Sequence, residues 1–216
     1  MATRRPSRRQ PSPDAPGWAF EAQLWRAGYT PVAGIDEAGR GALAGPIVAA
    51  AVVLPPGVHA FRDSKTVAPE GREHLAELVR VVAVCWGVGR AEATEVDRLG
   101  VPAATILAAQ RALRLLQVRP AGLVTDYLAI PGPWAVLAPA RADGRSVQAA
   151  AASLLAKTER DRWMIETADR DHPGYGFRRH KGYGSHAHLR ALHDLGPCPL
   201  HRRRFAPVAQ ASLFRP

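Results

Sequence analysis

The chain has little of the material from which disulfide-linked or membrane-spanning proteins are built. It holds only two cysteines, Cys85 and Cys198, which excludes a disulfide framework and fits a reducing cytoplasm. No apolar run approaches the roughly 20 residues that a membrane helix needs. The basic N-terminus is not followed by an apolar segment, as it would be in a secretory signal. We therefore expect a cytoplasmic protein that does not span a bilayer.

Acidic residues are also scarce relative to basic ones. The chain has 19 Asp and Glu against 29 Lys and Arg, which gives a net charge of +10. This excess predicts a polyanionic partner, with nucleic acid ahead of an anionic membrane surface. An arginine-rich proteome would account for part of it, so the charge alone does not identify the partner. With 216 residues, of which 47% are hydrophobic, the chain is long enough for one sizeable domain.

The most informative segment reads Gly-Ile-Asp-Glu-Ala-Gly-Arg-Gly at residues 34–41. Neighbouring side chains on a strand point to opposite faces, so Asp36 and Glu37 cannot both enter a core. The glycines let another backbone approach closely, and Arg40 supplies a cation suited to phosphate. This combination indicates a divalent metal between protein carboxylates and nucleic-acid phosphate. A solvated turn with incidental charges would explain the same eight residues.

The hydrophobic pattern predicts an α/β arrangement. Three early strands with loop-like connections indicate an antiparallel start, and a long helix before the fourth strand indicates a parallel crossover. The first strand is expected from about residue 31. The other expected strands are residues 43–54, 81–91, 122–127 and 134–139, and the expected helices are residues 18–26, 69–80, 101–117, 146–171 and 188–193.

Two further acids occupy positions where they can join the first pair. Asp126 falls in an apolar run that predicts a strand, where a carboxylate is costly unless it is paired or bound to metal. Asp143 precedes the long helix, so a role as its first residue explains it equally well. Four acids from separate segments match the needs of two-metal phosphodiester cleavage. The histidines of the last third form no zinc-type pair, and we expect most of them on the surface or facing nucleic acid.

At this level of detail the chain resembles the bacterial ribonuclease HII family over about residues 31–208. The motifs that carry the resemblance occur in the family's order along the chain. The family pattern is broken at Gly100, where Asn is usual, and at Tyr127, where Gly is common. The matching motifs are residues 34–46, Asp63-Ser64-Lys65, residues 150–157 with Arg160-Asp161, Tyr175-Gly-Phe177, residues 180–184, and His-Arg-Arg-Arg-Phe at residues 201–205.

The resemblance implies a ribonuclease H-like fold, which is a mixed five-stranded sheet flanked by helices with a small helical C-terminal region. It implies hydrolysis of RNA in RNA–DNA hybrids and cleavage on the 5′ side of ribonucleotides embedded in duplex DNA, leaving a 3′-hydroxyl and a 5′-phosphate. It also implies Mg²⁺ or Mn²⁺ as cofactor, with two ions when substrate is bound. The implied catalytic and metal-binding residues are Asp36, Glu37, Asp126 and Asp143, and the implied substrate contacts are Gly39, Arg40, Gly41, Ser64, Lys65, Lys157 and Tyr183.

The domain organisation follows from composition and from this resemblance. We expect a disordered basic tail at residues 1–16, a catalytic domain at 17–171, a region completing the substrate groove at 172–208, and a flexible tail at 209–216. The last tail reads Gln-x-Ser-Leu-Phe, which resembles peptides that dock on the bacterial sliding clamp. Packing of the tail on its own domain is the alternative. The implied clamp contacts are Gln210, Leu213 and Phe214.

Two other functions remain open on the sequence. A structure-specific DNA nuclease of the same fold would use the same acids. A non-catalytic nucleic-acid-binding protein would explain the net charge but would give Asp126 no purpose. Cleavage of a duplex that carries one ribonucleotide, with and without Mg²⁺, separates the three functions.

Overall fold

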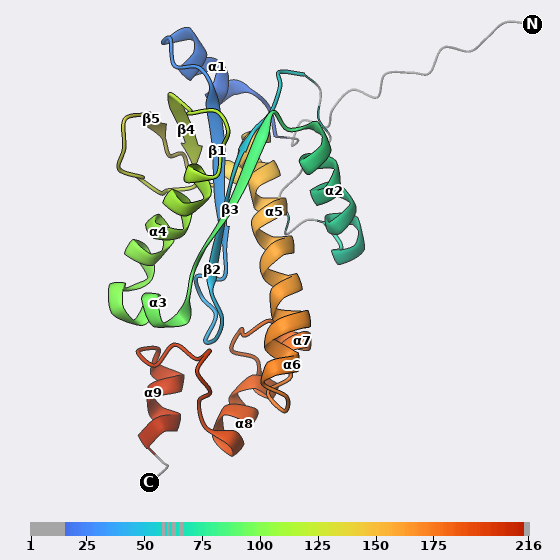
Figure 1. Ribbon diagram of the computed structural model, residues 1–216, viewed down its shortest axis with the longest axis vertical. Helices are drawn as coiled ribbons and strands as arrows, with labels where there is room; N and C mark the ends of the chain where they lie inside the picture. The colour runs from blue at the N-terminus through green and yellow to red at the C-terminus, as the bar shows by residue number, and fades with distance from the viewer. Residues whose placement is uncertain (1–15, 58, 60, 62–63, 65–66, 214–216) are drawn as a thin grey trace, which may run out of the picture.

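Figure 1 presents the chain as a computed structural model. The structure describes residues 16–57, 59, 61, 64 and 67–213. Its elements, in chain order, are α1 (Ala19–Arg26), β1 (Val32–Ala38), β2 (Ile47–Val53), α2 (Pro69–Val82), β3 (Cys85–Ala91), α3 (Ala93–Leu99), α4 (Val101–Arg114), β4 (Gly122–Thr125), β5 (Ala135–Leu137), the 3-10 turn η2 (Ala142–Gly144), α5 (Val147–Trp163), the π-helical η3 (Met164–Ala168), α6 (Asp169–Asp171), α7 (Phe177–His180), α8 (His186–Leu195) and α9 (Ala206–Leu213).

Some of the expectations lie outside the described residues. These are nearly all of the basic tail at residues 1–16, the phosphate-contacting Lys65, and the clamp-contacting Phe214. The backbone of Leu213 is described as part of α9, whereas its side chain is not. No described helix is long and apolar enough to cross a bilayer.

The strands form one mixed five-stranded sheet with the order β3-β2-β1-β4-β5. β1 and β3 both run antiparallel to β2, whereas β4 runs parallel to β1 and to β5. The antiparallel start and the parallel crossover expected from the sequence are therefore confirmed. The crossover from β3 to β4 contains α3 and α4, so the long apolar stripe of α4 lies against the sheet that it connects.

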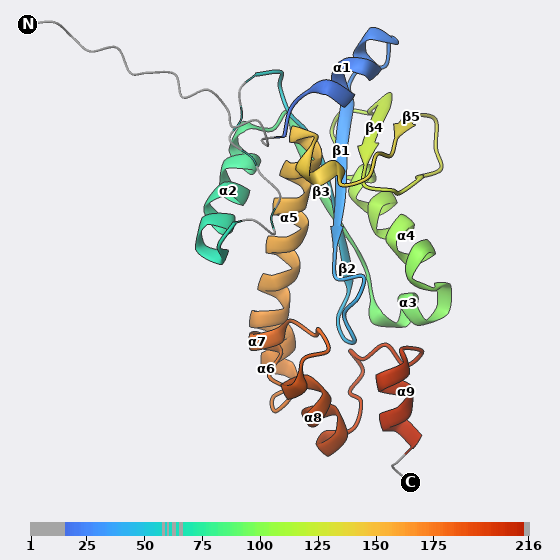
Figure 2. The same cartoon turned by 180° about the vertical axis from the view of Figure 1, so that it is seen from behind.

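Helices cover both faces of the sheet, as Figures 1 and 2 show from opposite sides. On one face, the alanines of α4 pack against Ile35 and its neighbours on β2. On the other face, the alanines of α5 pack against Ala50 and Val52. Since side chains alternate along a strand, Ile35 points to α4 and Asp36 points to α5. This alternation aims the first acid of the motif at α5 rather than at solvent.

α5 lies directly on β1 because one strand residue is a glycine. A Cβ at Gly34 would lie 2.2 Å from the backbone carbon of Gln148, closer than any side chain tolerates. The first turns of α5 are rich in alanine and buried, which also favours close approach of the helix to the sheet. This contact places Ser153, five residues further along α5, beside Asp36, to which its side chain is hydrogen-bonded.

The C-terminal region extends beyond one end of the sheet, where Figure 1 shows α7, α8 and α9 below the strands. The buried Val208 packs with Leu43 and Leu192, and Ala211 is partly buried against the same cluster. These contacts hold α9 on the domain. The boundary that we expect after residue 208 therefore falls inside α9, which continues to Leu213.

Several elements differ from the pattern read in the sequence, and β3, α3 and α5 show the main kinds of difference. The strand expected from residue 81 begins at Cys85, because α2 continues to Val82. The short helix α3 was not expected, although Glu92 and Glu95 close a capping box at its start. The long helix expected over residues 146–171 is α-helical to Trp163 and then passes through the π-helical η3 and α6.

Candidate metal and nucleic-acid site

The acids of the first motif meet a second acid because β1 and β4 are parallel neighbours. Ile35 pairs with Thr125, so Asp36 and Asp126 follow at the same edge of the sheet. Asp126 is not inside the strand, contrary to the expectation, because β4 ends at Thr125. The Thr125 hydroxyl donates to the Leu128 carbonyl at 2.6 Å, which turns the chain away from the sheet. Asp126 therefore stands half-buried at the strand end, where it can face a ligand.

Asp143 reaches the same edge from the turn before α5. It lies in η2 and is 2% exposed. The residue that caps α5 is Ser146, whose hydroxyl accepts the Ala149 N–H at 3.0 Å. Asp143 is thus not the residue that caps α5, which was the alternative role for it; its Oδ1 accepts the Gly144 N–H at 3.0 Å. The Ala142 N–H lies 3.4 Å from Asp126 Oδ1, so η2 and the end of β4 are in contact.

The carboxylates influence one another electrostatically. The pKa of Asp36 is raised well above its usual value, first by burial and then by the negative charges of Glu37 and Asp143. The Ser153 hydroxyl donates to the Asp36 carboxylate and opposes part of this effect. Ser153 Oγ in turn lies 2.8 Å from Ser64 Oγ. A buried carboxylate surrounded by like charges is the environment that a bound cation stabilises.

The donor set fits a divalent cation of the hard, oxygen-binding class. Across the described residues, no three His, Cys, Asp or Glu side chains converge closely enough to hold a metal by themselves. Mg²⁺ usually keeps several waters and binds one or two carboxylates together with substrate phosphates, so a closed protein cage is not required. The residues that would hold the ions are Asp36, Glu37, Asp126 and Asp143.

The loop at residues 39–41 follows directly and contains two glycines with different surroundings. Gly39 has a φ of +94°, and a Cβ there would lie 2.0 Å from Nε of the buried Arg160. A Cβ at Gly41 would meet nothing within 4 Å. The first glycine is therefore required by the protein's own packing, and the second leaves open space at the surface. Arg40, between them, pairs with Glu37 at 3.1 Å.

Tyr183 and Lys157, two residues for which the resemblance implies substrate contacts, lie close together. Lys157 Nζ lies 5.2 Å from the centre of the Tyr183 ring, and the Arg160 guanidinium lies 5.1 Å from it. Lys157 also forms an ion pair with Asp161 at 2.8 Å. Arg160 lies close to both Gly39 and Tyr183, so the glycine loop and this aromatic ring pack against the same arginine.

The residues expected to contact substrate or a partner differ in how exposed they are to solvent. Ser64 is 3% exposed, so its hydroxyl supports the Ser153–Asp36 contact from inside the protein. Gln210 is exposed on α9, in the C-terminal region. Of the six histidines in the last third, His186 and His193 are exposed and His172 and His180 are half-buried, whereas His188 and His201 are buried.

Sequence reasoning assigned no role to two buried arginines, Arg160 and Arg202. Both are 0% exposed, and both donate to backbone carbonyls of the turn between β1 and β2. The sequence did indicate that these two arginines matter, because each lies within a motif that carries the family resemblance. Composition alone favours an exposed arginine, and only the packing shows that these two are inside.

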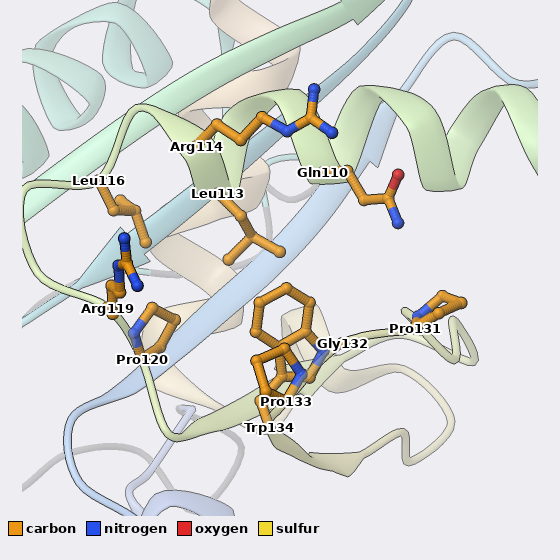
Figure 3. A pocket seen from close by; sticks show the side chains of 10 residues that line it. All are labelled: Gln110, Leu113, Arg114, Leu116, Arg119, Pro120, Pro131, Gly132, Pro133 and Trp134. Atoms are coloured by element: carbon orange, nitrogen blue, oxygen red, sulfur yellow. The ribbon is translucent and has the colours of Figure 1, made fainter.

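A hollow of about 500 Å³ lies elsewhere on the protein, between the end of α4 and the segment before β5 (Figure 3). Its lining includes Leu113, Arg114 and Trp134. The lining residues come before β4 and β5 in the chain, whereas Asp126 follows the C-terminal end of β4. Among the residues that the structure describes, none of the expected site residues lines this hollow.

The fold and the site together define a class of protein. A mixed sheet that carries several acids at one strand edge, beside a glycine loop and a cation-flanked aromatic ring, is a ribonuclease H-like nucleic-acid hydrolase. The family model of ribonuclease HII matches residues 33–208. The chain belongs to the ribonuclease HII family, whose members are metal-dependent ribonucleases H.

Relatives and solved structures agree with this assignment. Ribonuclease HII of Thermus thermophilus is 61% identical over 197 residues, which cover 91% of this chain and 96% of the relative. The structure of the PCNA:RNase HII complex from Archaeoglobus fulgidus matches with a TM-score of 0.69 at 25% identity, covering 84% of this chain and 96% of that one. The ribonuclease H2 from Pyrococcus horikoshii has the same fold, with a TM-score of 0.69 at 23% identity over 84% of this chain and 97% of that one.

Proposed function

We propose that this chain hydrolyses RNA in RNA–DNA hybrids and cuts on the 5′ side of single ribonucleotides embedded in duplex DNA. The observation that carries the proposal is the meeting of Asp36, Asp126 and η2 at one sheet edge, next to a glycine loop with open space above Gly41. The cut leaves a 3′-hydroxyl and a 5′-phosphate.

The acids act by holding divalent cations, for which Mg²⁺ and Mn²⁺ are the candidates. When bound, such ions supply Lewis-acid stabilisation of the phosphate and lower the pKa of a bound water. The proposed ligands are Asp36, Glu37, Asp126 and Asp143, with two ions when substrate is present. Ser64 and Ser153 orient the Asp36 carboxylate by hydrogen bonding.

Ribose recognition is proposed for the loop at residues 39–41 together with Tyr183. A ribonucleotide differs from the deoxyribonucleotide with the same base only in its 2′-hydroxyl, so discrimination requires groups that contact this hydroxyl. Tyr183 is 36% exposed, so part of this residue is accessible to a ligand. Lys157 and Lys65 complete the proposed set as phosphate contacts.

The decisive experiment is cleavage of a duplex that carries one ribonucleotide, with and without Mg²⁺. We expect Mg²⁺-dependent incision on the 5′ side of the ribonucleotide, and loss of incision in Asp126→Asn with binding retained, because duplex affinity comes largely from phosphate contacts. Glu73→Gln, on the exposed face of α2, is the matched control. Near-wild-type cleavage by Asp126→Asn at saturating Mg²⁺ would reject the metal assignment. Incision of a four-way DNA junction instead, or binding without incision, would point to the two other functions.

A cytoplasmic sliding clamp is the second proposed partner, contacted by Gln210, Leu213 and Phe214. Two facts support it: Gln210 is exposed on α9, and the archaeal relative of known structure is named as a complex with PCNA. Tethering to a clamp raises the effective concentration of an enzyme along DNA. Because α9 continues to Leu213, the clamp would bind the end of a helix or unwind its last turn.

A further inference from the structure

Arg202 is a buried cation whose hydrogen bonds converge on the turn between β1 and β2. Its Nη2 donates to the Gly39 carbonyl at 2.7 Å, and its Nη1 donates to the Arg40 carbonyl at 2.8 Å. Nη2 and Nε also donate to the Gly45 carbonyl, at 2.9 and 3.1 Å. One guanidinium thus binds three backbone carbonyls at the two ends of the turn.

Burying the charged Arg202 side chain costs free energy, which argues that this residue does more than fill space. Arg202 is 0% exposed, and burial, followed by the nearby charge of Arg160, lowers its pKa to about 9. A charged side chain removed from water is tolerated only when its donors are satisfied, and an apolar side chain would fill the same volume at lower cost. The forked guanidinium, however, can bind several carbonyls at fixed angles.

The peptide geometry shows what these hydrogen bonds do to the loop. In a trans peptide unit the carbonyl and the following N–H point in opposite directions. Arg202 draws the carbonyls of Gly39 and Arg40 inward, so the N–H groups of Arg40 and Gly41 point outward. Successive outward N–H groups form a small site for an oxygen ligand. Gly41 is exposed, and a Cβ there would meet nothing within 4 Å, so the loop has room for a ligand at this residue.

The later part of the turn, residues 43–46, is held by hydrogen bonds from other residues. Arg160 donates to the Pro46 carbonyl at 2.9 Å and to the Ala44 carbonyl at 3.2 Å. The Leu43 N–H donates to the Gly182 carbonyl at 2.8 Å. These contacts hold residues 43–46, whereas Arg202 holds the Arg40 carbonyl and, together with the Ala42 N–H at 3.3 Å, the Gly39 carbonyl.

We propose that Arg202 is a positioning residue, which turns the N–H groups of Arg40 and Gly41 toward the ribose 2′-hydroxyl of the substrate. This inference rests on the proposed function, since it concerns how ribose is distinguished from deoxyribose. Arg202 itself does not touch the substrate. It acts through the backbone that it orients.

The test is Arg202→Lys, which keeps the charge but replaces the fork with one ammonium group. Affinity is measured for a duplex with one ribonucleotide and for the same duplex in DNA only, in an Asp126→Asn background so that neither is cut. The loss of an oriented hydrogen bond predicts that the preference for the ribonucleotide falls by about tenfold, while affinity for the DNA duplex is retained. Arg203→Lys, one residue further on with an exposed side chain, is the matched control and should keep the preference.

An unchanged preference in a folded Arg202→Lys protein, or an equal loss of affinity for both duplexes, would overturn the inference. If that variant does not fold, amide shifts of the Asp126→Asn protein decide instead. The ¹⁵N–¹H signals of Arg40 and Gly41 should move more with the ribonucleotide duplex than with the DNA duplex, and equal movement would refute the proposed orientation. A parent protein with no preference for the ribonucleotide would reject the proposed function itself.

Discussion

His188 and His201 share a hydrogen bond between their Nε2 atoms, which lie 3.1 Å apart. His188 Nδ1 donates to the Tyr183 carbonyl at 3.0 Å, so its Nε2 is the acceptor. His201 Nε2 therefore donates, and its Nδ1 accepts the Cys198 N–H at 3.0 Å. The hydrogen bonds of each ring are those of a single neutral tautomer, with one ring nitrogen donating and the other accepting. The pair connects the segment before α9 to the backbone of Tyr183.

This pair predicts that stability depends on pH below neutrality. The pKa of each ring is lowered to about 4, first by burial; the charge of His180 adds to this effect at His188, and the charge of His188 adds to it at His201. The unfolded chain binds these protons near pH 6.5, so it holds more protons than the native state between about pH 6.5 and 4. Stability is therefore full above pH 6.5 and falls as the pH drops, by up to about 3 kcal/mol for one ring.

Urea unfolding at pH 7, 5.5 and 4.5 measures this effect. His188→Gln should flatten part of the pH dependence, because one of the two titrating rings is gone. His193→Gln, on the exposed side of α8, is the control and should leave the dependence unchanged. The same midpoint at all three pH values in the unmodified protein would contradict the prediction.

Asp36→Asn should abolish cleavage while making the metal-free protein more stable at pH 7. Losing a ligand of an activating cation removes several kcal/mol of transition-state stabilisation, which corresponds to roughly a thousandfold or more in rate. The raised pKa of Asp36 means that its ionised form destabilises the fold, and Asn carries no charge. Single-turnover cleavage and thermal melting without divalent ions check both parts. A variant that melts lower and still cleaves would contradict the assignment.

Tyr183→Phe should reduce cleavage at a single embedded ribonucleotide by about tenfold, the effect of one lost hydrogen bond. Phenylalanine keeps the ring contacts with Lys157 and Arg160, so affinity for an all-DNA duplex should not change. The measurement is kcat/KM on the ribonucleotide substrate beside a binding titration on DNA. Tyr29→Phe, at another exposed tyrosine, is the control. Equal reductions in cleavage and DNA binding would make Tyr183 a general contact only.

Gln210→Ala should weaken clamp binding and leave cleavage of short free substrates unchanged. Alanine is a good helix former, so α9 and its buried Val208 stay in place. We expect a parent affinity on the order of micromolar, because ordering a short segment offsets part of the contact energy. A titration of the clamp measures the change, with the exposed Gln117→Ala as control.

Deleting residues 209–216 is the stronger form of the same test. It should remove clamp binding, and it also shortens α9, where Ala211 is partly buried. Clamp binding that survives the deletion, or a large loss of thermal stability with no effect on the clamp, would show that the segment is structural.

Much of the architecture could be read from local patterns. Alternation along β1 required Asp36 and Glu37 to face apart, and the absence of Gly and Pro after Ser146 predicted a long helix. The long apolar stripe before β4 predicted the parallel crossover. Such features depend on neighbours within a few residues, so periodicity alone reveals them.

The sequence by itself determined which chemical groups the site has: paired carboxylates, a glycine loop, and an aromatic residue among cations. The tertiary structure alone decided where they stand. It places Asp126 just beyond β4, Asp143 in a separate turn, and Arg202 inside the protein under residues 39 and 40. The physical reason is range, because a side chain's burial and hydrogen-bond partners are set by segments that lie far away in the sequence. Arg202 and Gly39 are 163 residues apart and still form one hydrogen bond.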